Sequence, residues 1–465
     1  MDNKYELSYD KSDVDSILEF AKKLKGKTLR KMIKSEFLVK ESKEDYEQSE
    51  KIKGKFGQTL QEKYFGIKNN SDSEPDFKEV GVELKSTPIK KLVKGGFSPK
   101  ERLILNIIDY NKIIHETWEN SHFLTKNEKL LVIIYLYENG IPYLDFLIKY
   151  VEFYKLEGKD REIIKRDWET IVNKIKNNLA HELSEGDTLY LGACRKGHHE
   201  EPKVYGSSQE PAKQRAFSFK PNFMKSLLRK IEDAEPLIKD LEELRRKDFE
   251  EIVYDKFRSY LGLNVVDIEK RLNLEMNKSY GYYAILARKM LGINSKRIVE
   301  FEKAEIQMKT IRLKYNGMPK EDMSFPAFEF NEVAKQDWED SDFCDDLEKR
   351  FLFVIFQMNK DESEVIFKNA FFWVMPKQDL LEAQKVWEHA KKVVNEGIVV
   401  TSKGNINRNN LPKSSQNKVS HVRPHGKDKN DTDELPDGRK FVKSCFWLNK
   451  LYLKEQIEIH RNDLT

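Results

Sequence analysis

The chain has 465 residues, with 83 Lys or Arg against 79 Asp or Glu and a net charge of +4. This length predicts two or three domains, and the small net charge means that any basic surface must be local. Three cysteines exclude a disulfide scaffold and favour a reducing, cytoplasmic setting. We expect no secretory signal and no membrane partner, because the longest apolar stretch, Leu130–Tyr137, is far too short to span a membrane.

The first half of the chain alternates between predicted helices and strands. A capped helix is predicted from Asp13, and a second helix over Lys51–Lys68 that ends at Gly66. Gly81–Pro88 alternates apolar and charged residues, which predicts a strand with Glu83 and Lys85 on one face. Further along the chain we predict strands at Leu103–Tyr110 and Leu130–Tyr137, a helix at Asp160–Ala180, a strand at Asp187–Leu191 and a helix at Pro221–Ile231.

Three segments of the second half have distinctive compositions. Glu232–Glu251 is dense in charges of both signs, so we interpret it as a helical connector between domains. Phe371-Phe372-Trp373 is typical of a core strand. Thr401–Lys429 contains seven Lys or Arg and one acid, with many Asn, Gly and Ser residues, which predicts a basic loop region rather than core.

An internal repeat indicates that the two halves share one fold. Residues 118–129 recur at 338–349 with six of twelve positions identical, and an apolar run follows both copies. Residues 77–85 align with 301–309 at nearly the same offset. Order, spacing and composition agree, so we predict a duplicated α/β domain. Chance similarity between two α/β domains is the alternative.

The sharpest chemical motif is Asp76 followed, after six residues, by Glu83-Leu84-Lys85. Two carboxylates near a strand, with the carbonyl of Leu84, supply oxygen ligands for a hard divalent cation. Lys85 lies on the same strand face as Glu83, where its ammonium could orient an attacking water and stabilise charge on a phosphate. The alternative is an exposed strand with an ordinary Glu–Lys pair.

The surroundings of this motif favour a nuclease. Glu62 precedes it on a predicted helix that could bring a third carboxylate. From Lys85 to Arg102 the chain holds six Lys or Arg against one acid, Glu101. Such a local cationic surface suits a nucleic-acid backbone, although a solvated charged face is the alternative for any single lysine cluster.

These residues resemble the MutH-like endonucleases, with the family's blocks in order over about residues 50–230. The matching blocks are Lys53-Gly54-x-x-Gly57 through Glu62 and Gly66, Asp76 through Pro88, Trp118 through Lys126, Asp167-Trp168-Glu169, Tyr190-Leu191 with Arg195-Lys196, and Arg215 through Leu228. Glu62 matches only with one extra residue before it, and Gln61 is adjacent. The whole chain is similar to the two-domain, GATC-cutting type II restriction endonucleases.

The resemblance implies a role for each matching residue. Asp76 and Glu83 would bind Mg²⁺ together with the Leu84 carbonyl, and Glu62 would assist in placing metal or water. Lys85 would position the nucleophilic water, and Lys126 would support it. The implied DNA contacts are Lys53, Gly54, Arg195, Lys196 and Ser218. Ser218 stands where the repair nickase has a tyrosine in its methylation-sensing region, which puts strict dependence on adenine methylation in doubt.

The second copy lacks the acidic pattern of the first. In the alignment, Glu300 replaces Asp76, Gln307 replaces Glu83, Lys309 is retained and Asp346 stands at the position of Lys126. A neutral amide loses the charge that holds a metal, so we predict a nuclease fold without a working nuclease site.

The segment from His421 through Arg423 to His425 resembles the family's base-reading loop. Arg423 could contact guanine in the major groove. The second domain is therefore predicted to bind DNA and regulate activity, or to hold a second GATC. A decayed copy kept for packing is the alternative.

Zinc and ATP sites are not expected. Cys194 with His198 and His199 lacks paired ligand spacing, and Pro424 argues against a helix that would place His421 and His425 on one face. We find no glycine-rich phosphate loop in the sequence.

Together these observations predict two tandem restriction-endonuclease-like α/β domains, each a mixed β-sheet flanked by helices. We predict a catalytic domain at 1–231, a connector at 232–251 and a degenerate, DNA-binding domain at 252–465. The resemblance implies Mg²⁺-dependent cleavage of both DNA strands 5′ of the G of GATC. We expect a chain that is monomeric when free and either dimerises on DNA or nicks the strands in turn. A GATC-specific strand nickase of mismatch repair and a non-catalytic DNA-binding protein are the alternatives.

Overall fold

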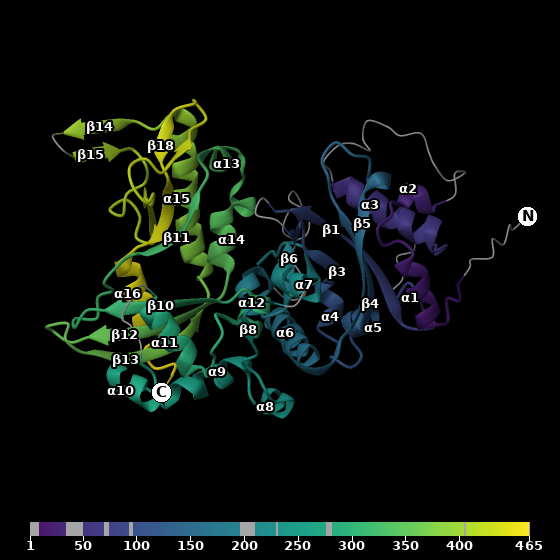
Figure 1. The fold of residues 1–465 in the computed structure, drawn as a ribbon, viewed down its shortest axis with the longest axis horizontal. Coiled ribbons are helices and arrows are strands. Elements are labelled where there is room, and N and C mark those ends of the chain that lie inside the picture. The colour runs from purple at the N-terminus through teal and green to yellow at the C-terminus, as the bar shows by residue number, and fades with distance from the viewer. Residues whose placement is uncertain are drawn as a thin grey trace, which may run out of the picture. The chain divides into compact units, whose positions relative to one another are not determined.

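The computed structural model describes residues 9–33, 50–68, 74–92, 96–195, 210–228, 231–275, 281–403 and 406–464. The chain divides into two compact units (Figure 1). The first unit comprises Met1–Leu183, Asp187–Asp233 and Glu302–Ala304, and the second comprises Ser184–Gly186, Ala234–Phe301 and Glu305–Thr465.

The first unit is built on two sheets. A four-stranded mixed sheet has the order β2-β1-β4-β5, in which β1 and β4 are parallel and the outer strands are antiparallel to their neighbours. A three-stranded antiparallel sheet has the order β3-β7-β6. The strands are β1 (Val82–Lys91), β2 (Phe97–Pro99), β3 (Leu103–Ile107), β4 (Lys129–Leu136), β5 (Leu147–Lys155), β6 (Leu191–Arg195) and β7 (Arg215–Phe219). The main helices are α1 (Val14–Lys22), α2 (Leu29–Met32), α3 (Glu50–Thr59), α4 (Tyr110–Ile113), α5 (His122–Asn127), α6 (Gly158–Lys176) and α7 (Pro221–Leu228).

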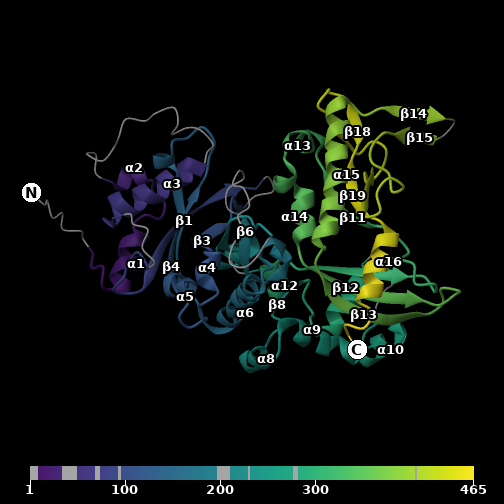
Figure 2. The same ribbon diagram turned by 180° about the vertical axis from the view of Figure 1, so that it is seen from behind.

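The two faces of β1 in the larger sheet serve different purposes. Val82 and Leu84 are buried in a core with Leu131 of β4 and with Ile17 and Phe56 of the N-terminal helices. Helices α1 to α3 therefore cover this face, while α5 lies on the other side of the sheet (Figures 1 and 2). Because side chains alternate along a strand, Glu83 and Lys85 point away from this apolar core.

The second unit repeats this arrangement. Its three-stranded mixed sheet has the order β10-β12-β13, and its antiparallel sheet has the order β11-β19-β16. These strands are β10 (Gln307–Leu313), β11 (Met323–Phe328), β12 (Phe351–Met358), β13 (Val365–Trp373), β16 (Ser420–Pro424) and β19 (Ser444–Leu448). The helices are α8 (Leu241–Arg246), α9 (Phe249–Arg258), α10 (Val265–Arg271), α11 (Tyr282–Met290), α13 (Phe330–Lys335), α14 (Asp342–Glu348), α15 (Lys377–Glu396) and α16 (Lys450–Ile459). Helix α12 (Val299–Ala304) begins in this unit, and its last three residues belong to the first unit. Two small hairpins, β14 (Val400–Lys403) with β15 (Ile406–Asn409) and β17 (Thr432–Glu434) with β18 (Lys440–Val442), extend it.

The strand registers confirm the duplication. Glu83 lies opposite Leu130 in the parallel pair β1·β4, and Gln307 lies opposite Phe351 in the pair β10·β12. The irregularity between β4 and β5 at Ile134/Tyr135 has its counterpart between β12 and β13 at Ile355/Phe356. Such irregularities are structural features of a fold rather than accidents of sequence, so their recurrence supports a common origin of the two copies.

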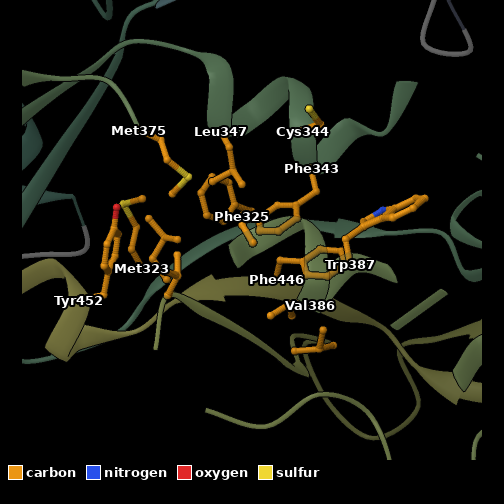
Figure 3. Close-up of a cluster of buried hydrophobic side chains, with 14 of the residues drawn as sticks. Met323, Phe325, Phe343, Cys344, Leu347, Met375, Val386, Trp387, Phe446 and Tyr452 are labelled. Carbon is orange, nitrogen blue, oxygen red and sulfur yellow. The ribbon is translucent and has the colours of Figure 1, made fainter. Parts of the chain in front are cut away.

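The aromatic cores match as well. In the second unit, Phe343 of α14 stacks on Phe446 of β19 with ring centroids 4.1 Å apart, beside Trp387 of α15 (Figure 3). In the first unit, Phe123 of α5 meets Phe217 of β7 at 5.0 Å. These rings pin α5 and α14 against the small sheet of their own unit, and each helix carries a residue of the predicted site or its degenerate counterpart.

Most predicted elements are confirmed, but three are wrong in extent or type. The strand predicted from Leu103 ends at Ile107, because Asp109 accepts hydrogen bonds from backbone amides and caps α4. The strand predicted at Asp187–Leu191 begins only at Leu191. Its predicted residues instead donate backbone N–H groups to the buried Asp167 carboxylate, with N···O distances of 2.6–2.9 Å.

The third prediction that is wrong is the basic loop region at Thr401–Lys429. It contains β15 and β16, and its residues Leu411, Val419 and Val422 are buried. The sheet β11-β19-β16 draws the apolar residues of this segment into the core, although its overall composition is polar. By contrast, Phe371-Phe372-Trp373 lies in β13 and is buried, as predicted.

Candidate active site

A tight turn before β1 brings Asp76 back against Glu83. Phe77 and Val82 exchange two backbone hydrogen bonds, of 2.9 and 3.2 Å, across this turn. Gly81 adopts a φ of +66°, a conformation that favours glycine, and the ring of Phe77 is buried and anchors the turn. As a result, the backbone N–H of Asp76 donates to Oε2 of Glu83 at 3.1 Å.

The two carboxylates share a poorly solvated position. Glu83 is only 3% exposed, and Asp76 accepts a hydrogen bond from the backbone N–H of Leu84 through Oδ2, at 3.0 Å. Burial, followed by the nearby charge of Glu83, raises the pKa of Asp76 from its ordinary value of 3.8 to about 6. Concentrated negative charge of this kind suits a site that binds a cation.

Two lysines complete the group from different elements. Nζ of Lys85, on β1, donates to Oε1 of Glu83 at 2.8 Å and to the carbonyl of Leu105 at 3.0 Å. Nζ of Lys126 lies 3.7 Å from the same Glu83 oxygen. Lys126 reaches this point from the last turn of α5, whose first turn is capped by the hydroxyl of Ser121. The structure therefore brings together Asp76, Glu83, Lys85 and Lys126.

Glu62 does not join this group, so the expected third carboxylate is corrected. Its Oε1 accepts a hydrogen bond from Gln58 at 3.0 Å, and its Oε2 lies 3.9 Å from Nζ of Lys63. The neighbouring Gln61 reaches the site instead: its Nε2 donates to Oδ1 of Asp76 at 2.5 Å. The sequence signal for this difference is the extra residue before Glu62, because it places Gln61, one residue earlier, at the helix position that faces Asp76.

The expected DNA contacts of the first unit have mixed outcomes. Gly54 is exposed on α3, and Arg195 ends β6 opposite Arg215. Ser218 is 0% exposed, because β7 is the central strand of its sheet, so a direct contact with DNA is not available to it. The side chain of Lys53 and the whole of Lys196 lie outside the described residues.

The second unit presents Arg423 but not His421. His421 is 2% exposed, and its Nδ1 lies 2.5 Å from Oδ1 of Asn449, so the expected direct DNA contact is wrong for this residue. The guanidinium of Arg423 lies over the ring of Trp447 at 4.8 Å and forms an ion pair with Asp322 at 3.0 Å, with half of its side chain exposed. His425 is exposed and meets the edge of Trp447.

The degenerate site of the second unit differs residue by residue. Glu300 is buried and accepts backbone hydrogen bonds from Leu237 and Ile238 at 2.7 and 3.1 Å, so it caps a loop. Gln307 is exposed, whereas Glu83 is buried. Asp346 forms an ion pair with Lys349.

Lys309 is a lysine like Lys85, the residue at the same register position of the first unit. Burial lowers the pKa of Lys309, and the charge of Asp346 opposes that shift. In the second unit, the carboxylate that acts on the retained lysine is therefore that of Asp346 on helix α14.

Within the described residues, no cluster of three or more His, Cys, Asp or Glu side chains has the arrangement of a metal site. Among the helices of the described ranges, none has the length and apolar character needed to cross a membrane.

Comparisons with known proteins agree with the duplicated fold. The family model described as DNA mismatch repair enzyme MutH matches residues 65–167 and 291–384. The chain is 36% identical over 446 residues to the type II restriction enzyme Sau3AI of Staphylococcus aureus, an alignment that covers 85% of this chain and 91% of that protein.

The mismatch-repair relatives match less of the chain. Identity to the DNA mismatch repair protein MutH of Buchnera aphidicola is 29% over 157 residues, covering 33% of this chain and 70% of that protein. Identity to MutH of Vibrio campbellii is 27% over 184 residues, covering 38% and 78%. With Sau3AI matched over nearly its whole length, the chain belongs to the MutH-like endonuclease family.

Proposed function

We propose that the chain is a type II restriction endonuclease that hydrolyses both strands of DNA at GATC, 5′ of the G, in a Mg²⁺-dependent reaction. The observation that carries this proposal is the convergence of Asp76, Glu83, Lys85 and Lys126 in one partly buried group. The relationship to a restriction enzyme across both copies supports the restriction activity over the repair activity of the shorter relatives.

The donor set fits a hard divalent cation. Asp76 and Glu83 are adjacent carboxylates, and burial, followed by the nearby charge of Glu83, raises the pKa of Asp76; a bound cation would offset both effects. The carbonyl of Leu84 is the third oxygen that we assign to the site. Mg²⁺ is commonly held by one or two carboxylates with substrate phosphate and water, so two carboxylates suffice. A bound Mg²⁺ would supply charge neutralisation and a more acidic water.

Lys85 would position the attacking water. An ammonium group has three N–H donors, and two of those on Lys85 are directed to Glu83 and to the Leu105 carbonyl. The third can serve a water or a phosphate oxygen. Lys126 adds a second positive charge near the same carboxylate, which would stabilise the charge that develops on the phosphate.

The second unit would bind DNA without cutting it and would regulate the first. A pocket of about 210 Å³ beside β10 is lined by Lys309, Arg312 and Lys320 together with Glu321 and Asp322, and its three cationic groups would contact a phosphate backbone. Arg423 and His425 are exposed at the end of β16. These features support binding of DNA, including a second GATC, at this unit.

One catalytic group per chain has a geometric consequence. A palindromic duplex presents two strands, so we infer that a chain that is monomeric when free either dimerises on DNA or nicks the strands in turn.

The test is digestion of an unmodified plasmid that contains GATC by the protein alone with Mg²⁺. We expect linear DNA whose sequenced ends begin at the G of GATC. Nicking that requires hemimethylated sites and mismatch-repair partners would instead support the repair nickase, and binding without any cleavage would support a non-catalytic DNA-binding protein.

A further inference from the structure

The helix that precedes the active-site turn ends in an unusual way. Helix α3 (Glu50–Thr59) passes directly into a π-helical turn over Leu60–Tyr64. The backbone N–H of Phe65 donates to the carbonyl of Leu60, five residues earlier, at 3.1 Å. A π-turn holds one more residue than an α-turn, and such turns occur often at functional sites.

The π-turn leaves the apolar side of this helix in place. Leu60 is 1% exposed and Phe65 is 0% exposed, and the hydroxyl of Tyr64 donates to the carbonyl of Phe20 at 2.8 Å. The extra residue is therefore absorbed without rotating these side chains out of the core. What changes is the polar side, where Gln61 takes the position facing Asp76.

The contact between Gln61 and Asp76 fixes the carboxylate. Oδ1 of Asp76 accepts from Nε2 of Gln61, and Oδ2 accepts from the backbone N–H of Leu84. With both oxygens held by donors, rotation of the carboxylate plane is restricted. Glu62 is turned toward Gln58 and Lys63 on its own helix.

The corresponding helix of the second unit lacks this device. Helix α11 (Tyr282–Met290) also precedes the first strand of its sheet, but it closes with an ordinary α-turn in which the N–H of Leu291 donates to the carbonyl of Ala287. The π-turn is thus present in the unit that carries the paired carboxylates. The helix of the other unit keeps four-residue bonding through Leu291 and then ends in a turn at Gly292, where the N–H of Ile293 donates to the carbonyl of Arg288.

We propose that Gln61, in place of Glu62, is the third polar side chain of the catalytic group and acts as a positioning residue for Asp76. The inference rests on the proposed nuclease function. Because Gln61 is neutral, the charged members of the group are two carboxylates, Asp76 and Glu83, and two ammonium groups, Lys85 and Lys126. Its divalent cation is then held by two carboxylates, with Gln61 orienting one of them.

Three variants test this assignment: Gln61→Ala, Gln61→Glu and Glu62→Gln. The first readout is Mn²⁺ binding to the free protein by calorimetry. Side chains that hydrogen-bond to metal ligands commonly contribute about 10-fold to 100-fold to affinity or activity, so Gln61→Ala is expected to weaken Mn²⁺ binding by about that factor. Gln61→Glu adds a carboxylate beside Asp76 and is expected to tighten it. Glu62→Gln is the matched control, expected within about twofold of wild type.

The second readout separates positioning from general structure. We measure the affinity for GATC DNA in Ca²⁺ and the single-turnover cleavage rate at saturating enzyme. Gln61→Ala is expected to lower the cleavage rate by about 10-fold or more while DNA affinity stays the same. Weakened Mn²⁺ binding in Glu62→Gln, or wild-type Mn²⁺ binding in both Gln61 variants, would overturn the proposal.

These outcomes also distinguish the two proposals. If the wild type binds Mn²⁺ in a Gln61-dependent way but does not cut GATC, the role of Gln61 stands and the proposed function fails. If the wild type cuts GATC and the Gln61 variants match it in both readouts, the role of Gln61 alone fails.

Discussion

The two units share strand order, register and even sheet irregularities, yet they use equivalent positions differently. In the first, Glu83 is buried against Asp76 and two lysines. In the second, Gln307 is exposed at the same register. A fold can therefore retain even the position of its register irregularities while the residues of the active site change. For this reason function must be argued from the site.

The position aligned with Asp76 shows the difference most clearly. The carboxylate of Asp76 is held next to that of Glu83, and burial together with the charge of Glu83 raises the pKa of Asp76 to about 6. The hydrogen-bonding capacity of the Glu300 carboxylate is used, since both of its oxygens accept backbone hydrogen bonds. One carboxylate is placed for binding a cation and the other for stability. The variants below convert one copy toward the other.

The largest effect is expected from Glu83→Gln, which gives the first unit the residue of the second. The loss of the charge shared by both lysines should lower the single-turnover cleavage rate by a factor on the order of 10³, with DNA binding retained. Gln307→Glu is the reciprocal control. It should not add a second cleavage activity, because Glu300 remains committed to the amides of Leu237 and Ile238. Cleavage by Glu83→Gln at the wild-type rate would show that the site is elsewhere.

A smaller loss is expected from Lys126→Asp, which copies the charge reversal at Asp346. Placing a carboxylate near Glu83 removes positive charge from the group, so the cleavage rate should fall by about 10²-fold. Asp346→Lys is the matched change in the second unit and should leave cleavage of a one-site duplex intact. Rates are compared in single turnovers. Equal losses in both variants would contradict the assignment of catalysis to the first unit.

Stability should change in opposite directions at the aligned acids. The folded pKa of Asp76, about 6, lies above its ordinary 3.8, so the free energy of unfolding falls as the pH rises from about 4 to about 6, and the full destabilisation is present above pH 6. In metal-free protein, Asp76→Asn should raise the free energy of unfolding at pH 7.5 by about 1–3 kcal/mol, and the gain should vanish as the pH falls toward 4.

Glu300→Gln is the control for this prediction. It leaves a buried backbone N–H without an acceptor, so it should lower the free energy of unfolding by about 1–3 kcal/mol. Denaturant unfolding at two pH values measures both effects. A loss of stability in both variants at pH 7.5 would show that Asp76 is as satisfied as Glu300.

The smallest effect is expected in the DNA-binding role of the second unit. Arg423→Ala should reduce the stimulation of cleavage by a second GATC by roughly 3-fold to 10-fold, with the catalytic group unchanged. Arg439→Ala is a matched control, since Arg439 is about equally exposed, at 56% against 53%, and is likewise paired with an aspartate. Identical rates on one-site and two-site DNA for wild type and Arg423→Ala would remove this role.

The parts of the site that were predictable from sequence are local. Asp76, Glu83 and Lys85 lie on one turn and one strand, so their spacing alone indicates that they meet. The duplication was visible because the repeat preserves the order of its blocks. Lys126 required the family resemblance, since α5 reaches β1 only through the tertiary fold.

The parts that were missed depend on packing between distant segments. The choice between Gln61 and Glu62 is made by a π-turn, which follows from the burial of Leu60 and Tyr64 rather than from helix propensity. Ser218 is hidden because its strand is central in a sheet. The late start of β6 reflects the buried carboxylate of Asp167, which is more than twenty residues away.

The most direct test of a single catalytic unit is strand-resolved cleavage of a GATC duplex labelled on both strands, comparing Lys85→Ala with Lys309→Ala. These lysines occupy the same register position in β1 and β10. We expect Lys85→Ala to cut neither strand, and Lys309→Ala to cut both strands of this one-site duplex with wild-type ends, because the DNA contact proposed for Lys309 serves a second site. Loss of cleavage of one strand in Lys309→Ala would contradict the account, because it would mean that each unit cuts one strand.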